Sequence, residues 1–140
     1  MLIRNVMLAL MVFAGACSTQ GNVFSLGVGQ CFAGVVTVEE EVSEVSTVDC
    51  VEPHINEVYA LPLLPDGDFP SVFVDDDSGD LCLAAFESYV GIAYEYSIYD
   101  IGWLRPSQET WDKWDDREVV CYLYDFNGET KTGTARSSGR

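Results

Sequence analysis

The sequence predicts an α+β fold: a small, mostly antiparallel sheet with one main helix and one short helix, held by two disulfides. Three observations support this class. The chain has 140 residues, the length of one domain or at most two. Its hydrophobic fraction of 48% is typical of a globular protein. Stretches rich in β-branched and aromatic residues alternate with turn signals, and two stretches have the features of helices.

The chain is strongly acidic, with 23 acidic and 7 basic residues and a formal net charge of −16. This charge repels phosphate backbones, so nucleic acid is not an expected partner. It also argues against adsorption onto anionic lipid through basic residues. Composition alone indicates no catalytic activity.

Residues 1–16 are predicted to be a signal peptide. One base, Arg4, precedes an apolar run from Val6 to Phe13, and the small residues Ala14 to Ala16 follow. A basic start, a short apolar run and a small-residue exit are typical of secretory signals. The run is shorter than the stretch of about 20 apolar residues that a membrane-spanning helix needs.

Cys17 is predicted to carry a lipid. The small residues before it resemble a bacterial lipobox, although a lipobox usually has Leu where Ala14 stands. The thiol would then be linked to diacylglycerol, and cleavage would make Cys17 the new N-terminus, with a net charge of −17. Cysteine parity favours this interpretation, because four cysteines remain for pairing. Plain secretion and an uncleaved anchor are the alternatives.

The mature chain is expected to contain one compact domain. Residues 17–26 form the lipidated cysteine and a tether, residues 27–136 the domain, and residues 137–140 a polar tail. The expected strands cover Val28 to Val38 (with a bulge or turn at Gly34), Val42 to Val48, Glu57 to Leu64, Ala93 to Ile101, and Glu118 to Tyr124. In the fourth of these, Tyr94, Tyr96 and Ile98 would share one side. A turn at Asn127-Gly128 would lead into residues 130–135.

Two helices are expected. Residues 69–79 are predicted to be a loop, after which Asp80 would cap a helix over Leu81 to Val90 that ends at Gly91. The helical face that we expect to be buried consists of Cys82, Ala85, Phe86, Tyr89 and Val90. A short helix through Trp111 would begin at Pro106-Ser107, with Ser107 as its cap.

The four later cysteines predict two disulfides, because an exported chain meets an oxidising environment. Three pairings are possible, and spacing alone does not choose among them. We favour Cys31–Cys50, which would join neighbouring strands, and Cys82–Cys121, which would join the main helix to the last long strand. A four-cysteine zinc site is disfavoured, since the chain has no Cys-x-x-Cys pair. No metal and no cofactor are expected.

His54 is the one histidine of the chain, and Glu57 lies three residues after it. The pair could form a structural hydrogen bond, contact a ligand or partner, bind a metal or act as a base. We see no Gly-x-Ser-x-Gly nucleophile motif and no His-Glu-x-x-His zinc motif. We therefore expect no enzymatic activity. The alternative is a small extracytoplasmic enzyme or ligand-binding protein that uses His54 and Glu57.

Other residues suggest weaker sites. The acidic run from Asp75 to Asp80 indicates a solvated loop or a weak calcium site, but its glycine comes one residue too early for a calcium loop. The aromatic residues, Trp111 among them, could pack in the core or line a groove. Arg117 is expected to form a salt bridge that fixes the turn after Asp115 and Asp116. Trp111 and Arg117 are also possible partner contacts.

The order of these pieces resembles the septum-formation domain of actinobacterial membrane proteins and lipoproteins. The similarity covers about residues 28–136, and the family usually has glycine where Asp115 stands. The matching residues are Val28-Gly29-Gln30-Cys31-Phe32, Val48-Asp49-Cys50-Val51-Glu52-Pro53-His54, Glu57-Val58, Cys82, Ala85-Phe86, Tyr89-Val90-Gly91, Pro106-Ser107, Trp111, Asp116-Arg117-Glu118-Val119-Val120-Cys121 and Thr132-Gly133-Thr134-Ala135-Arg136.

The resemblance implies a location and a process but no catalytic residues. Such domains lie outside the cytoplasmic membrane, on membrane segments or lipid anchors, and their family name links them to cell division. It therefore implies a lipid-anchored extracytoplasmic binding or scaffold module. The expected partners are the membrane, through the anchor, and a protein or cell-envelope component.

Overall fold

The computed structural model describes residues 19–22, 25–34 and 44–140. The predicted signal peptide (1–16) and the predicted lipid site, Cys17, lie outside the described residues, as does part of the predicted tether. Neither helix within the described ranges is long and apolar enough to cross a membrane.

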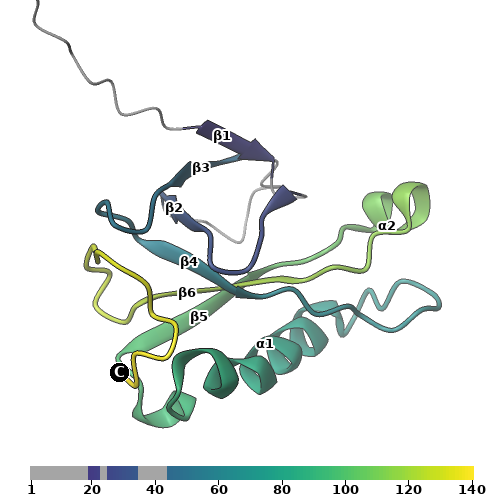
Figure 1. The fold of residues 1–140 in the computed structure, drawn as a ribbon. Helices are drawn as coiled ribbons and strands as arrows, with labels where there is room; N and C mark the ends of the chain where they lie inside the picture. The colour runs from purple at the N-terminus through teal and green to yellow at the C-terminus, as the bar shows by residue number, and fades with distance from the viewer. Residues whose placement is uncertain (1–18, 23–24, 35–43) are drawn as a thin grey trace, which may run out of the picture.

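The described chain forms one antiparallel sheet of six strands, in the order β1-β3-β2-β4-β6-β5, with helix α1 against it (Figure 1). This arrangement confirms the predicted α+β class. The strands are β1 (Thr19–Asn22), β2 (Cys31–Ala33), β3 (Glu44–Val48), β4 (Asn56–Ala60), β5 (Tyr99–Leu104) and β6 (Val120–Asp125). Strands β2 and β4 are shorter than predicted, and β6 begins two residues later and ends one residue later than predicted. Residues 35–38, which were predicted to continue β2, lie outside the described residues.

Helix α1 (Val74–Val90) packs on β4 and β5 and supplies five of the thirteen described buried residues of the larger core. Its buried face includes Cys82, Phe86, Tyr89 and Val90, as the helical spacing predicts. Gly91 ends the helix with φ of 88° and donates its N–H to the carbonyl of Glu87, which is the expected left-handed cap.

The predicted start of this helix was wrong. α1 begins at Val74, so residues 75–79 are helical and Asp80 lies inside the helix. Asp75, Asp76 and Asp77 occupy the first turn, where the helix dipole stabilises negative charge. The glycine that suggested a loop has a packing reason, since a Cβ on Gly79 would lie 3.1 Å from the Trp103 ring. The acidic loop of the calcium alternative therefore does not form.

The predicted strand over residues 93–101 was also wrong in its first half. Tyr94–Tyr96 form a 3₁₀ turn (η2), and β5 begins only at Tyr99. Tyr94 donates a hydrogen bond of 2.6 Å to Asp100, whereas Tyr96 is 78% exposed. The alternating pattern in this stretch therefore belongs to a turn, in which Tyr94 is partly buried and Tyr96 is exposed.

Helix α2 (Gln108–Trp114) begins where the sequence predicts and continues three residues past the expected end. Ser107 accepts a hydrogen bond from the Thr110 N–H, and Thr110 in turn accepts one from the Ser107 N–H. This reciprocal capping box stabilises the first turn. Asp115 ends the helix in the left-handed region, at φ of 54°.

The C-terminal segment does not extend β6 into a hairpin strand. After the turn at Gly128, residues 130–135 cross back toward the β3–β4 connection, and Lys131 pairs with His54 through two backbone hydrogen bonds of 2.9 Å (Figure 1). The predicted polar tail docks on the end of α1: Ser137 and Gly139 each donate an N–H, at 2.8 Å, to carbonyls of Tyr89 and Val90. The tail thus completes the helix terminus.

Both predicted disulfides are present. Cys31–Cys50 joins β2 to the turn after β3, with Cα atoms 5.3 Å apart, and Cys82–Cys121 joins α1 to β6, with Cα atoms 5.4 Å apart. Cys82 and Cys121 are fully buried in the larger core. The second bridge therefore fixes the helix to the centre of the sheet.

Candidate functional site

Glu57 is a fully buried carboxylate at the centre of the sheet. It lies on β4, opposite Cys31 of β2. Its oxygens accept hydrogen bonds from the Tyr89 hydroxyl at 2.7 Å, the Lys131 ammonium at 2.7 Å and the Ala135 N–H at 2.8 Å. The Thr134 hydroxyl is a fourth donor. A buried charge with this many donors is satisfied in the ionised state.

The protonation of this cluster follows from its contacts. Burial alone would raise the pKa of Glu57, but the hydrogen bonds from Lys131, Thr134, Ala135 and Tyr89 outweigh burial and hold that pKa below its ordinary value. Burial and the bond to Glu57 raise the pKa of Tyr89 to about 12. Burial lowers the pKa of Lys131, against the opposing effect of Glu57. At neutral pH the pair is an ionised carboxylate and an ammonium.

His54 lies beside this carboxylate and is only 1% exposed. Its Nδ1 is 2.8 Å from the Glu52 carbonyl oxygen, which can only accept, so Nδ1 carries the proton in the neutral ring. The Nε2 atom is buried and has no hydrogen-bond partner among the described residues. Burial also lowers the pKa of His54. The ring is therefore neutral and presents an unused lone pair.

Cys31, His54 and Glu57 converge on one buried point. Each offers one potential ligand atom, and these three atoms lie within 4.8 Å of one another. The sulfur of Cys31 is bonded to Cys50, so the oxidised chain offers no thiolate there.

The sequence predicted His54 and Glu57 as a pair but missed their partners. Lys131 follows Glu57 by 74 residues and Thr134 follows it by 77. One signal was available: the chain has few cations, so a lysine far from any acidic run is a candidate partner for a buried carboxylate.

Trp111 and Arg117 form a second cluster that shares no residue with the first. The Arg117 guanidinium lies 3.6 Å above the centre of the Trp111 ring. It also contacts the Asp115 carboxylate at 2.8 Å, which is the salt bridge that the sequence suggests. The Trp111 indole donates to the Gly67 carbonyl at 3.0 Å and is 4% exposed. These contacts fix α2 and the turn after it.

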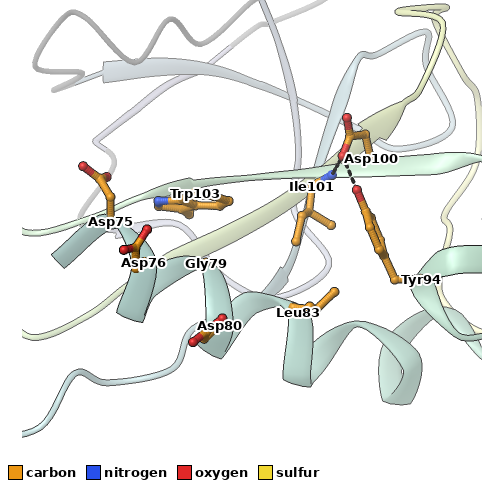
Figure 2. Close-up of a pocket in the computed structure, with 9 residues that line it drawn as sticks. All are labelled: Asp75, Asp76, Gly79, Asp80, Leu83, Tyr94, Asp100, Ile101 and Trp103. Carbon is orange, nitrogen blue, oxygen red and sulfur yellow. Dashed lines mark hydrogen bonds between the residues drawn. The ribbon is translucent and has the colours of Figure 1, made fainter. Parts of the chain in front are cut away.

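An open groove lies between the first half of α1 and strand β5 (Figure 2). Four carboxylates line it, with apolar side chains between them and the Trp103 ring over the helix backbone. Asp75 is engaged by Arg105 at 2.6 Å, and Asp100 by Tyr94. The lining residues are Asp75, Asp76, Gly79, Asp80, Leu83, Tyr94, Asp100, Ile101 and Trp103. The sequence placed the first aspartates in a loop and so missed this surface.

The fold and these sites define a small α+β domain with two disulfides, a buried Glu–Lys–His cluster and an acidic groove. No family model matches the chain, and no solved structure matches it. It is similar to two curated proteins, each named "Putative lipoprotein LppN", from Mycobacterium bovis (strain ATCC BAA-935 / AF2122/97) and Mycobacterium tuberculosis (strain ATCC 25618 / H37Rv).

Each of these relatives is 31% identical to the chain over 115 residues. The similarity covers 80% of this chain and 63% of each relative, so the chain spans less than two thirds of their length. Both relatives are named as lipoproteins.

Proposed function

We propose that the protein is a lipid-anchored, extracytoplasmic binding or scaffold module. The name of the two relatives supports the anchor, together with the small residues before Cys17. The two disulfides support the compartment, because such bonds persist in oxidising environments. A rigid, cross-linked domain on a lipid anchor is suited to holding a partner at a membrane surface.

The groove between α1 and β5 is the proposed binding surface, and it is the observation that carries this function. Asp76 and Asp80 are exposed on its helix side, and Trp103 and Ile101 form its strand side (Figure 2). Carboxylates around an aromatic ring favour a ligand that is cationic and partly apolar, since the ring face also attracts cations. A basic segment of an envelope protein has this chemistry.

The septum-formation resemblance supplies the proposed process, which is cell division or envelope maintenance. We propose binding rather than catalysis, because the carboxylate beside the one histidine is buried out of reach of a substrate. Glu57 accepts from four donor residues and is fully buried. A general base must lie within hydrogen-bond reach of a substrate, and both Glu57 and His54 are buried.

The test is crosslinking in intact cells followed by recovery of the protein with its partner. Asp76→Asn with Asp80→Asn removes two groove charges. The matched control, Asp77→Asn with Glu87→Gln, removes two charges from the same helix outside the groove lining. We expect the groove variant to lose the crosslinked partner and the control to keep it. Equal recovery from both variants would contradict the assignment of the groove.

The process is tested separately by deleting the gene. Septum placement and envelope integrity are then measured by microscopy with a membrane dye. Misplaced septa or leaking cells support the proposal. Unchanged septa and envelope, with no crosslinked partner, count against it.

A further inference from the structure

We propose that Cys31, Cys50, His54 and Glu57 form a redox-controlled metal site. In the disulfide state the site binds no metal. After reduction by a dithiol, the two thiolates, the imidazole and the carboxylate bind one thiophilic divalent cation such as Zn²⁺.

The potential ligand atoms lie close enough together to reach one metal ion. The ligand atoms of Cys31, His54 and Glu57 lie within 4.8 Å of one another, and all three residues are buried. Zn²⁺ binds sulfur at about 2.3 Å and nitrogen or oxygen at about 2.0–2.2 Å. Ligand atoms around one ion are therefore about 3–4 Å apart, which small side-chain shifts can reach from here. Cys50, freed from the same disulfide, supplies the fourth ligand.

The unpartnered nitrogen of His54 is an independent observation that points to a ligand. Its Nδ1 is held by the Glu52 carbonyl, which fixes the ring. The Nε2 lone pair is buried without a partner among the described residues. A metal-binding histidine is usually held in this way, with one nitrogen on a carbonyl and the other on the ion.

The disulfide of this site is the one that a reductant can reach. Cys50 is partly exposed, whereas Cys82 and Cys121 are both fully buried. A thiolate of the dithiol attacks the sulfur of Cys50, the S–S bond breaks, and Cys31 leaves as a thiolate that takes up a proton. The second thiolate of the reductant then attacks the mixed disulfide and releases Cys50, so the dithiol is oxidised and the protein reduced by two electrons.

The charges balance in each state of the site. In the oxidised protein the Glu57 carboxylate faces the Lys131 ammonium at 2.7 Å. When the metal binds, the two thiols release their protons to solvent. The dication and Lys131 then neutralise two thiolates and one carboxylate. A neutral site avoids the large cost of an unpaired buried charge.

The test uses the full chain with Cys17→Ser, so that no other free thiol binds metal, and Co²⁺ alone as the probe. Alkylation and mass spectrometry first show which cysteines a dithiol frees. We expect Cys31 and Cys50 to be freed, and the reduced chain to bind one equivalent of Co²⁺ with a thiolate charge-transfer band. Release of Cys82 and Cys121 first, or no Co²⁺ bound by the reduced chain, would overturn the proposal.

A variant tests the ligand set. His54→Gln should weaken Co²⁺ binding by the reduced chain at least about tenfold, because loss of a direct ligand costs no less than loss of an outer contact. Unchanged affinity would contradict the site. If this variant unfolds, X-ray absorption of the reduced, Zn²⁺-loaded wild type decides: two sulfur and two nitrogen or oxygen ligands support the site, and four sulfurs exclude it.

Discussion

Lys131 and Glu57 form an ion pair of 2.7 Å across 74 residues of sequence, with side chains that are 13% and 0% exposed. The pair joins the C-terminal segment to the central strand β4. Attraction between charges in such a dry position is strong, and so is the penalty for leaving one of them alone.

We expect Lys131→Met to lower the free energy of unfolding by about 3 kcal/mol, because it leaves the Glu57 charge buried without its cation. Adding Glu57→Gln should recover part of that loss. Urea unfolding of the single and double variants measures the coupling. The control is Lys113→Met in the exposed pair with Glu109, which should change stability little, because solvent screens that pair.

Stability should fall in acid because of Glu57. Its pKa in the folded chain is below the ordinary value of 4.5, so its contribution is complete above that pH and is lost as pH falls through the folded pKa. Asp75, whose pKa the bond to Arg105 lowers, contributes in the same direction. Unfolding titrations between pH 6 and pH 2 should show a smaller decline for Glu57→Gln than for the wild type. An equal decline would show that Glu57 is not responsible.

Arg117→Lys should destabilise the turn after α2 although it keeps the charge. Lysine lacks the planar group that stacks on Trp111 and reaches several acceptors at once. We expect a loss of about 1–2 kcal/mol, measured by chemical unfolding. Arg105→Lys, at the more exposed pair with Asp75, is the control and should cost clearly less. Equal losses would argue against the stacking contribution.

Asp115 occupies a backbone conformation that suits glycine, the residue the septum-formation pattern has there. Asp115→Gly relieves a left-handed φ of 54° but removes an exposed contact to Arg117. We expect stability to stay unchanged or to rise by up to about 1 kcal/mol. Asp115→Ala removes the contact without relieving the backbone, so it should be less stable than both. A thermal melt that ranks alanine above glycine would contradict this account.

Gly102 on β5 is expected to tolerate no side chain. It lies opposite Tyr122 of β6, and a Cβ at Gly102 would overlap the Tyr122 ring. Gly102→Ala should therefore cost about 1–3 kcal/mol. Gly27→Ala is the matched control, since a Cβ there meets nothing within 4 Å. Thermal melts of the two variants should differ clearly, and equal melts would contradict the packing argument.

The sequence predicted features that depend on local chemistry. Ser107 as a cap, Gly91 as a helix end and the two cysteine pairings were all confirmed. The prediction from sequence was wrong where tertiary packing determines the structure. Gly79, which suggested a loop, lies inside α1 with the Trp103 ring packed against it, and local propensity does not reveal such a contact.

The candidate site was predictable only in part, for the same reason. His54 and Glu57 are neighbours in the sequence, and their proximity was evident. The segment from Lys131 to Ala135 reaches Glu57 by crossing back over the sheet, with one backbone bridge instead of a strand. Such a segment has no hydrophobic periodicity that a sequence could show, because its Lys131 and Thr134 side chains bind Glu57 and do not form a regular strand or helix face.

The sequence distance between Glu57 and its donors Lys131, Thr134 and Ala135 has a consequence for biogenesis. The carboxylate in the middle of the sheet has no cation until Lys131 has been synthesised, 74 residues later. The buried cluster can therefore close only after both helices and the last strand have been made.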